Sequence, residues 1–151
     1  MTKHSILLAL SGSEQSRNAA ELSWKIAKQL KAEVIAEHII DSAYLWEFYR
    51  NDKPGFIGSG PYISAYEATL AAMRTTAEKL LLSYESHANG QGIAGDNFYK
   101  EGNLIEILTE DAKGCSLLVM GHNPHGERRT KAHQSHSRYS LAEGIAHLST
   151  T

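Results

Sequence analysis

The sequence predicts one α/β domain with an open parallel sheet and helices on both faces. Three observations predict this fold. Short, continuously apolar runs alternate with segments of helical period, and such runs are typical of strands buried on both faces. Each run is far shorter than the roughly 20 residues that span a membrane. The chain has 151 residues, which suits a single domain, and we assign residues 1–151 to it.

A first βαβ unit spans residues 5–40. Ser5–Leu10 is an apolar run that predicts a strand, and residues 32–40 predict a second one. The segment between them predicts a helix over residues 13–31, because one face carries Ala19, Leu22, Ile26 and Leu30. Ser11 and Glu14 have the spacing of a capping box at its start.

Residues 41–61 interrupt this alternation. Turn-forming residues cluster at 51–55 and 58–61, which predicts a loop. The segment is also rich in aromatic side chains, so we expect the loop to pack on its own domain. These side chains are Tyr44, Trp46, Phe48, Tyr49 and Phe56.

The second half of the chain continues the α/β order. Apolar residues from Ile63 to Tyr84 step by three or four, and Asn89-Gly90 ends this long helix. Residues 97–100 predict a short strand, and Asn103 with Glu106 predicts the capped start of another helix. Residues 115–120 predict the next strand, and residues 141–148 a last short helix.

Composition narrows the class of protein. Lys and Arg number 15 against 17 Asp and Glu, and Cys115 is the single cysteine, so a disulfide scaffold is excluded. The N-terminus carries no secretory pattern. We therefore expect a cytoplasmic protein with no membrane or nucleic-acid partner.

Positive charge gathers in residues 121–140. This segment holds four basic residues against Glu127, a net charge of +3, together with four histidines. A short basic segment in an acidic chain favours a small anion such as phosphate over a nucleic acid, which needs a broader basic surface. A solvated loop is the alternative.

The expected ligand site lies beyond the carboxyl ends of the strands. Three stretches meet there: residues 10–13, residues 39–41 and the segment from Gly121 onward. We expect the segment after Gly121 to end at a helix N-terminus, which favours anions. A nucleotide fits this edge, with apolar walls for a base and glycines with basic residues for phosphates.

Residues 6–16 (ILLALSGSEQS) resemble the opening of the universal stress protein family, which commonly reads I-L-V-A-V-D-G-S-E-x-S. His38-Ile39-Ile40-Asp41 is similar to its H-V-x-D, and Glu101-Gly102 opens a stretch similar to its E-G-x-x-x-E-I motif. Residues 117–121 are similar to its L-I-V-M-G motif, and residues 140–145 to the helix after its phosphate loop.

The resemblance implies a flavodoxin-like, five-stranded parallel sheet in three α/β/α layers, with a homodimer and an adenine nucleotide as ligand. ATP-binding members carry G-x2-G-x9-G-[ST] after the fourth strand. Here Ser11 stands where the family often has Asp, and Pro124 and Tyr139 replace two motif glycines. The loop to Ser140 is five residues longer. The chain also lacks a recognisable final strand, which puts the usual dimer through that strand in doubt.

Together these observations predict a regulatory protein of the stress response that binds ATP or another adenine nucleotide, with Mg²⁺ as a possible companion. Ala9, Leu10 and Ile39 are assigned to the base, and Ser11 and Asp41 to the ribose. The phosphates are assigned to Gly121, His122, Gly126, Arg128 and Ser140. No catalytic residue is assigned, and slow ATP hydrolysis is the most we expect. The full candidate set is Ala9, Leu10, Ser11, Ile39, Asp41, Met120, Gly121, His122, Gly126, Arg128 and Ser140.

Three alternatives remain open at this point. The chain is a nucleotide-independent interaction protein, or its histidine-rich loop binds a metal. Two H-x2-H pairs supply enough nitrogen ligands for zinc: His122, His125, His133 and His136. In the third alternative it is an ATP pyrophosphatase, because residues 11–16 faintly resemble the S-G-G-x-D-S loop of those enzymes.

Overall fold

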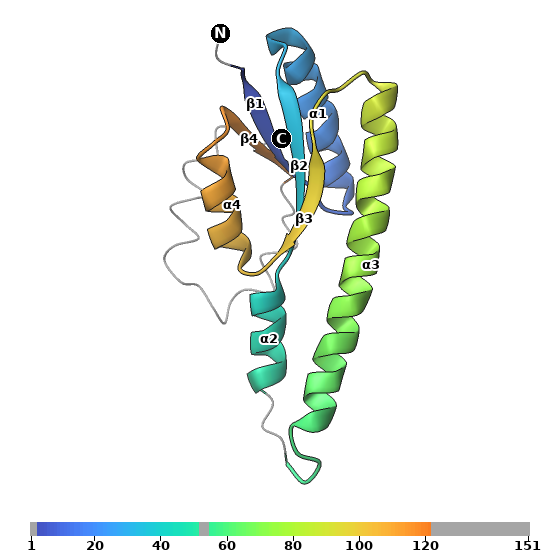
Figure 1. Cartoon of the computed structure of the whole chain (residues 1–151), viewed down its shortest axis with the longest axis vertical. Helices are drawn as coiled ribbons and strands as arrows, with labels where there is room; N and C mark the ends of the chain where they lie inside the picture. The colour runs from blue at the N-terminus through green and yellow to red at the C-terminus, as the bar shows by residue number, and fades with distance from the viewer. Residues whose placement is uncertain (1–2, 52–54, 122–151) are drawn as a thin grey trace.

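We analysed a computed structural model, which describes residues 3–51 and 55–121. These residues form a four-stranded parallel sheet in the order β3-β2-β1-β4 (Figure 1). The elements in chain order are β1 (Ser5–Ala9), α1 (Glu14–Leu30), β2 (Glu33–Ile40), α2 (Ser42–Asn51), α3 (Gly60–Gly90), β3 (Asn97–Glu101), α4 (Leu104–Ala112) and β4 (Leu117–Met120).

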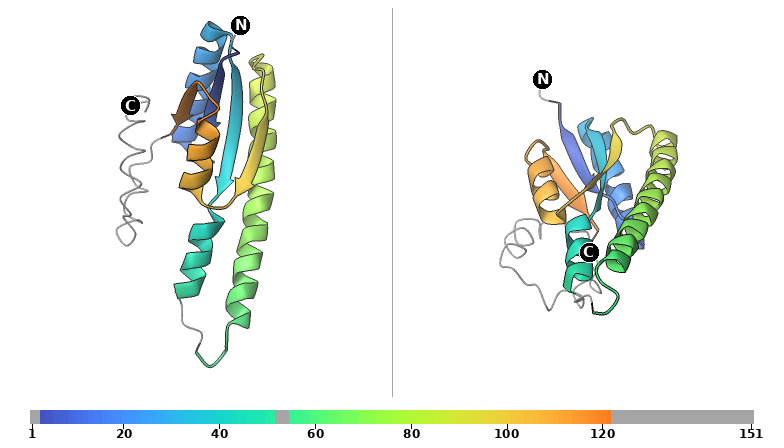
Figure 2. Two further views of the ribbon diagram at one scale, coloured as in Figure 1. Left: turned by 60° about the vertical axis from the view of Figure 1, so that its left-hand side comes forward. Right: turned by 60° about the horizontal axis from the view of Figure 1, so that its bottom comes forward.

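Helices cover both faces of the sheet (Figures 1 and 2). Successive side chains of a strand point to opposite faces, so β1 contributes to two cores. Ile6 and Leu8 pack with residues of α1 and α3, whereas Leu7 packs with Leu108 of α4. The predicted open parallel α/β fold with two covered faces is confirmed.

The prediction of a loop over residues 41–61 was wrong in its first half. Ser42–Asn51 forms α2, which packs against α3. Leu45 contacts a small core around Leu70, and the Tyr49 hydroxyl lies 3.0 Å from Thr69 Oγ1. Trp46 and Tyr49 thus pack in a helix–helix seam against Tyr66. The expectation of self-packing fails for Tyr44, Phe48 and Phe56, whose side chains are exposed.

The cap of α1 also differs from the prediction. Ser13, not Ser11, is the N-cap, and its hydroxyl accepts a hydrogen bond from the Ser16 amide. The predicted cap of α4 is confirmed, because the Asn103 side chain accepts from the Glu106 amide at 3.0 Å.

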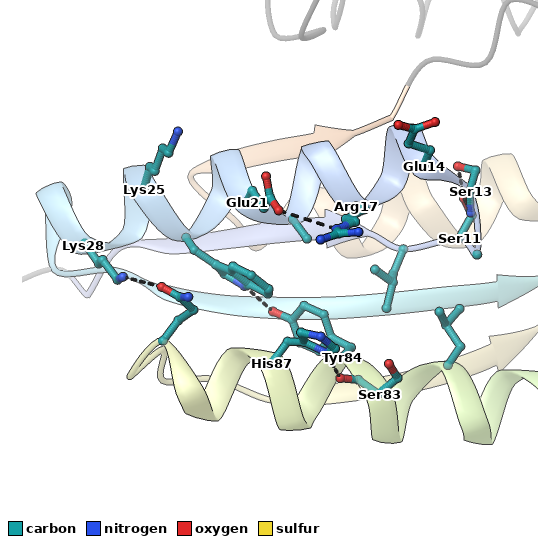
Figure 3. A pocket seen from close by; sticks show the side chains of 16 residues that line it. Ser11, Ser13, Glu14, Arg17, Glu21, Lys25, Lys28, Ser83, Tyr84 and His87 are labelled. Carbon is teal, nitrogen blue, oxygen red and sulfur yellow. Dashed lines mark hydrogen bonds and ion pairs between the residues drawn. The ribbon is translucent and has the colours of Figure 1, made fainter.

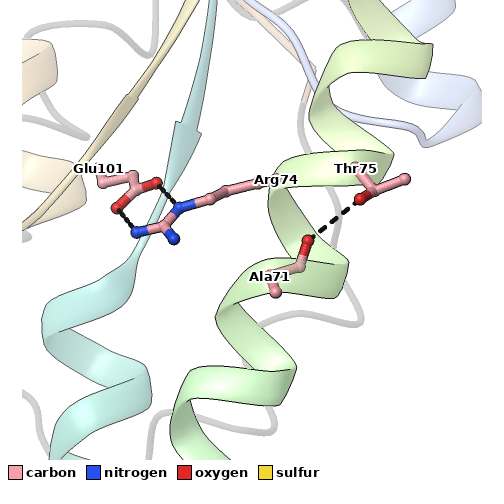
Figure 4. Close-up of polar contacts among 4 residues, drawn as sticks. All are labelled: Ala71, Arg74, Thr75 and Glu101. Carbon is pink, nitrogen blue, oxygen red and sulfur yellow. Dashed lines mark hydrogen bonds and ion pairs between the residues drawn. The ribbon is translucent and has the colours of Figure 1, made fainter.

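An ion pair fixes α3 to the carboxyl end of β3 (Figure 4). The Arg74 guanidinium binds both carboxylate oxygens of Glu101, with a distance of 2.9 Å from Nη2 to Oε2. This hydrogen-bonded cation holds the pKa of the Glu101 carboxyl below its usual value. Next to it, the Gly102 amide donates to the Ile40 carbonyl at 3.1 Å, which ties the end of β3 to the end of β2.

Among the described residues, β4 pairs with β1 alone. The predicted last helix over residues 141–148 lies outside the described residues, so it and the lack of a final strand stay predictions. None of the helices in the described ranges combines the length and apolar character that a membrane crossing requires.

Candidate functional site

Three of the candidate residues share one face of the sheet at its carboxyl edge. Ala9 on β1 lies opposite Met120 on β4, and both pack, with Ile39 of β2, on the core beneath α4. All three side chains are partly buried, so each keeps some exposed apolar surface. Leu10 differs, because it is buried in the core on the opposite face.

The turn after β1 is held by serine hydroxyls. The Ser11 amide donates to Ser16 Oγ at 2.7 Å, and Ser11 Oγ lies 2.9 Å from Ser13 Oγ. Ser11 itself is exposed. These hydrogen bonds set the path of the chain from β1 into the first turn of α1, and they leave the Ser11 side chain at the surface of the edge.

Two side chains at the end of β2 support the same region. His38 Nδ1 lies 2.8 Å from the Leu10 carbonyl, and because a carbonyl only accepts, this nitrogen carries the proton. Asp41 Oδ1 accepts from the Tyr44 amide at 3.2 Å, so Asp41 caps α2. Oδ2 of Asp41 has no hydrogen bond within the described ranges.

Gly121 brings the end of β4 against the first turn of α1. A Cβ atom built at Gly121 would lie 2.6 Å from the Gln15 carbonyl carbon and 2.7 Å from the Ser16 amide nitrogen. Side chains cannot enter this contact between two backbones, so the position requires glycine. The segment that begins at Gly121 therefore starts beside the turn at residues 11–16.

Replacing Gly121 by alanine should lower the free energy of unfolding by about 1–3 kcal/mol, because one of the two backbones must move. Urea unfolding of the variant and the wild type measures this difference. Gly12→Ala is the control, since nothing lies within 4 Å of a Cβ at that position. Equal losses for both variants would contradict the close approach.

The remaining predicted residues cannot be placed. His122, Gly126, Arg128 and Ser140, which were assigned to phosphate, lie outside the described residues, as do His125, His133 and His136. Within residues 3–51 and 55–121, no group of three or more His, Cys, Asp or Glu side chains is arranged to hold a metal ion.

A groove of about 840 Å³ runs between α1 and α3 (Figure 3). Trp24 and Tyr84 are joined in it, since Trp24 Nε1 donates to the Tyr84 hydroxyl at 3.2 Å. Charged side chains of α1 such as Lys25 and Lys28 line it. Leu10 and Ser11 reach one end of the groove, but Ala9, Ile39, Asp41, Met120 and Gly121 do not line it. Of the candidate residues that the structure describes, two therefore line this groove and the other five lie outside it.

Glu37 is a buried acid that the sequence analysis missed. Its side chain is 1% exposed, and neither carboxylate oxygen has a hydrogen-bond partner among the described residues. Burial and the nearby carboxylate of Asp111 raise its pKa to about 8, while Lys100 opposes the shift. Lys100 Nζ lies 2.5 Å from Asp111 Oδ2, so Asp111 carries the negative charge of the group. The sequence does carry a signal for this buried group, because Glu37 is an acidic residue within an otherwise apolar strand.

Three solved structures of similar fold are named as universal stress proteins. A universal stress protein family member from Burkholderia pseudomallei superimposes with a TM-score of 0.56 at 24% identity, covering 82% of this chain and 85% of that one. UspA from Lactobacillus plantarum gives 0.53 at 14% identity, covering 97% and 93%. A universal stress protein in complex with cAMP gives 0.51 at 17% identity, covering 100% and 94%.

No protein-family model and no curated protein matches the sequence. At these identities, the likeness of structure establishes the fold. The chain has the fold of the universal stress proteins, as its sequence predicted.

Proposed function

We propose that this chain is a universal stress protein that binds an adenine nucleotide at the carboxyl edge of its sheet and acts by regulation. The single observation that carries the proposal is the contact between Gly121 and the first turn of α1. It joins the start of the basic segment to the serine-rich turn, next to the partly exposed apolar surface of Ala9, Ile39 and Met120.

Each part of the edge suits one part of a nucleotide. The apolar surface of Ala9, Ile39 and Met120 suits the flat face of a base. Ser11 Oγ and the second carboxylate oxygen of Asp41 suit the ribose hydroxyls. The phosphates would be bound by His122, Gly126, Arg128 and Ser140. Leu10 supports the turn instead of touching the base, since its side chain is buried and its amide and carbonyl are bound to Glu37 and His38.

Support for an adenine nucleotide comes from the neighbour of similar fold that was solved with cAMP. ATP with Mg²⁺ is our first candidate ligand, because the basic segment offers several cations to a triphosphate. The proposal includes no catalytic residue. Asp41 is the carboxylate among the described candidates, and it is engaged in capping α2.

Calorimetric titration of the full chain with ATP–Mg²⁺ tests this proposal, and we expect saturable heat. Asp41→Asn should weaken binding by roughly 5–10-fold, because a neutral acceptor forms a weaker hydrogen bond to a hydroxyl than a carboxylate does. Asparagine still caps a helix, so the fold is kept. Glu85→Gln, on an exposed part of α3, is the matched control and should bind like the wild type.

Two outcomes would contradict the proposal. Absence of heat with ATP, AMP and cAMP at millimolar concentration would favour a nucleotide-independent interaction protein. Release of pyrophosphate from ATP would favour the enzymatic alternative. Equal affinities of the wild type and Asp41→Asn would remove Asp41 from the site.

A further inference from the structure

α2 and the first half of α3 project beyond the carboxyl ends of the strands (Figures 1 and 2). We call residues 42–51 and 55–73 the helical arm. Most of the arm lies past the sheet, so the sheet cannot cover it. Its two helices hold each other through their own seam, in which Trp46 and Tyr49 both pack edge-on against Tyr66.

Apolar side chains remain exposed after this seam is formed. Nine large hydrophobic side chains are exposed in the described residues, and seven of them belong to the arm. Phe48 is 61% exposed and Ile57 is 66% exposed. The seven are Tyr44, Trp46, Phe48, Phe56, Ile57, Ile63 and Met73. Monomeric proteins rarely gather apolar surface in this way, so the arm has the character of an interface.

The charge of the arm indicates what covers it. Its described residues carry three charged side chains, Glu47, Arg50 and Glu67. Anionic lipid surfaces and nucleic acids bind clusters of Lys and Arg, which these residues do not supply. Glu47 and Arg50 carry opposite charges three residues apart on α2, an arrangement that can pair with itself.

The size of the exposed apolar surface also fits a second copy of this chain as the partner. The seven side chains together expose an area on the order of 900 Å², obtained from their exposed fractions and the surface area of such residues. A standard interface takes about 800 Å² from each partner. A two-fold interface buries the same patch on both copies, so one arm can cover the other.

We propose that two copies of this chain associate through their helical arms around a two-fold axis that is perpendicular to α2. The α2 helices then run antiparallel, which reverses their order and sets Glu47 of one copy against the partner's Arg50. The exposed aromatic side chains fill the space between the arms. This dimer needs no strand pairing at β4 and no nucleotide.

Sedimentation velocity of the full chain tests the proposal. The wild type should dissociate from dimer to monomer on dilution. Phe48→Glu should raise the dissociation constant by roughly 30-fold or more, because it places a charge in the apolar part of the interface. Leu82→Glu is the matched control: Leu82 is 67% exposed on α3 outside the arm, and the variant should dimerise like the wild type.

A charge exchange separates direct pairing from a general loss of folding. Glu47→Arg and Arg50→Glu should each weaken the dimer, and the double variant should restore it. Circular dichroism of every variant should match the wild type. A wild type that is monomeric at all concentrations, or that binds lipid vesicles as a monomer, would overturn the proposal. So would equal dissociation constants for Phe48→Glu and the wild type.

Discussion

Replacing Glu37 by glutamine should make the protein more stable at pH 8 and should flatten the dependence of its stability on pH. Burial and Asp111 raise the pKa of Glu37 from 4.5 to about 8 in the folded state. Between these two values the unfolded chain has released the proton while the folded chain keeps it. The wild type therefore loses stability as the pH rises through this window, by up to about 5 kcal/mol.

Urea unfolding at intervals from pH 4.5 to pH 8.5 measures this effect. The stability that Glu37 contributes should be fully present below pH 4.5 and lost once the pH exceeds about 8. Asp111→Asn should move the window of change to lower pH, because the Asp111 carboxylate raises the pKa of Glu37. Parallel curves for the wild type and Glu37→Gln would show that Glu37 titrates like an exposed acid.

Replacing Gly95 by alanine should cost about 3–5 kcal/mol of stability. Gly95 has φ +139, and a Cβ atom there would lie 1.9 Å from the Val34 carbonyl oxygen. Hydrogen bonds to β2 hold both sides of this glycine, from the Val34 amide to the Ala94 carbonyl and from the Ala36 amide to the Asp96 carbonyl. The clash would separate the start of β3 from β2.

Gly92→Ala separates backbone strain from this clash. Gly92 has φ +69, but nothing lies within 4 Å of a Cβ there, so its replacement should cost about 1–2 kcal/mol from strain alone. Thermal unfolding compares the two variants. A loss for Gly95→Ala no larger than that for Gly92→Ala would show that the start of β3 does not lie so close to Val34.

The periodicity of apolar residues predicted the order of strands and helices because burial dictates both. The three apolar runs form β1, β2 and β4, the short strand predicted over residues 97–100 is β3, and the three helices predicted within residues 13–112 are confirmed. α2 was missed because its seam is only ten residues long and depends on Leu45 and Tyr49 meeting α3. Ser11 was predicted as the cap because Glu14 lies three positions on. Ser13 has Ser16 at the same spacing, and only the path of the chain makes Ser13 the cap.

The sequence predicted less of the candidate site than it did of the fold. The rule for parallel sheets predicted that residues 10–13, residues 39–41 and Gly121 meet at one edge. It does not distinguish the two faces of the sheet, so Ala9 and Leu10 were both assigned to the base although they lie on opposite faces. The raised pKa of Glu37 and the requirement for glycine at Gly121 both arise from contacts between distant segments. No local pattern predicts such contacts.

The most direct test of nucleotide binding at the carboxyl edge is a titration of the ¹⁵N-labelled full chain with ATP–Mg²⁺, followed by amide chemical shifts. The account predicts saturable shifts at Ser11, Asp41 and Gly121, with Lys25 and Lys28 in the groove between α1 and α3 unchanged. Shifts confined to the groove, or none at saturating nucleotide, would contradict it.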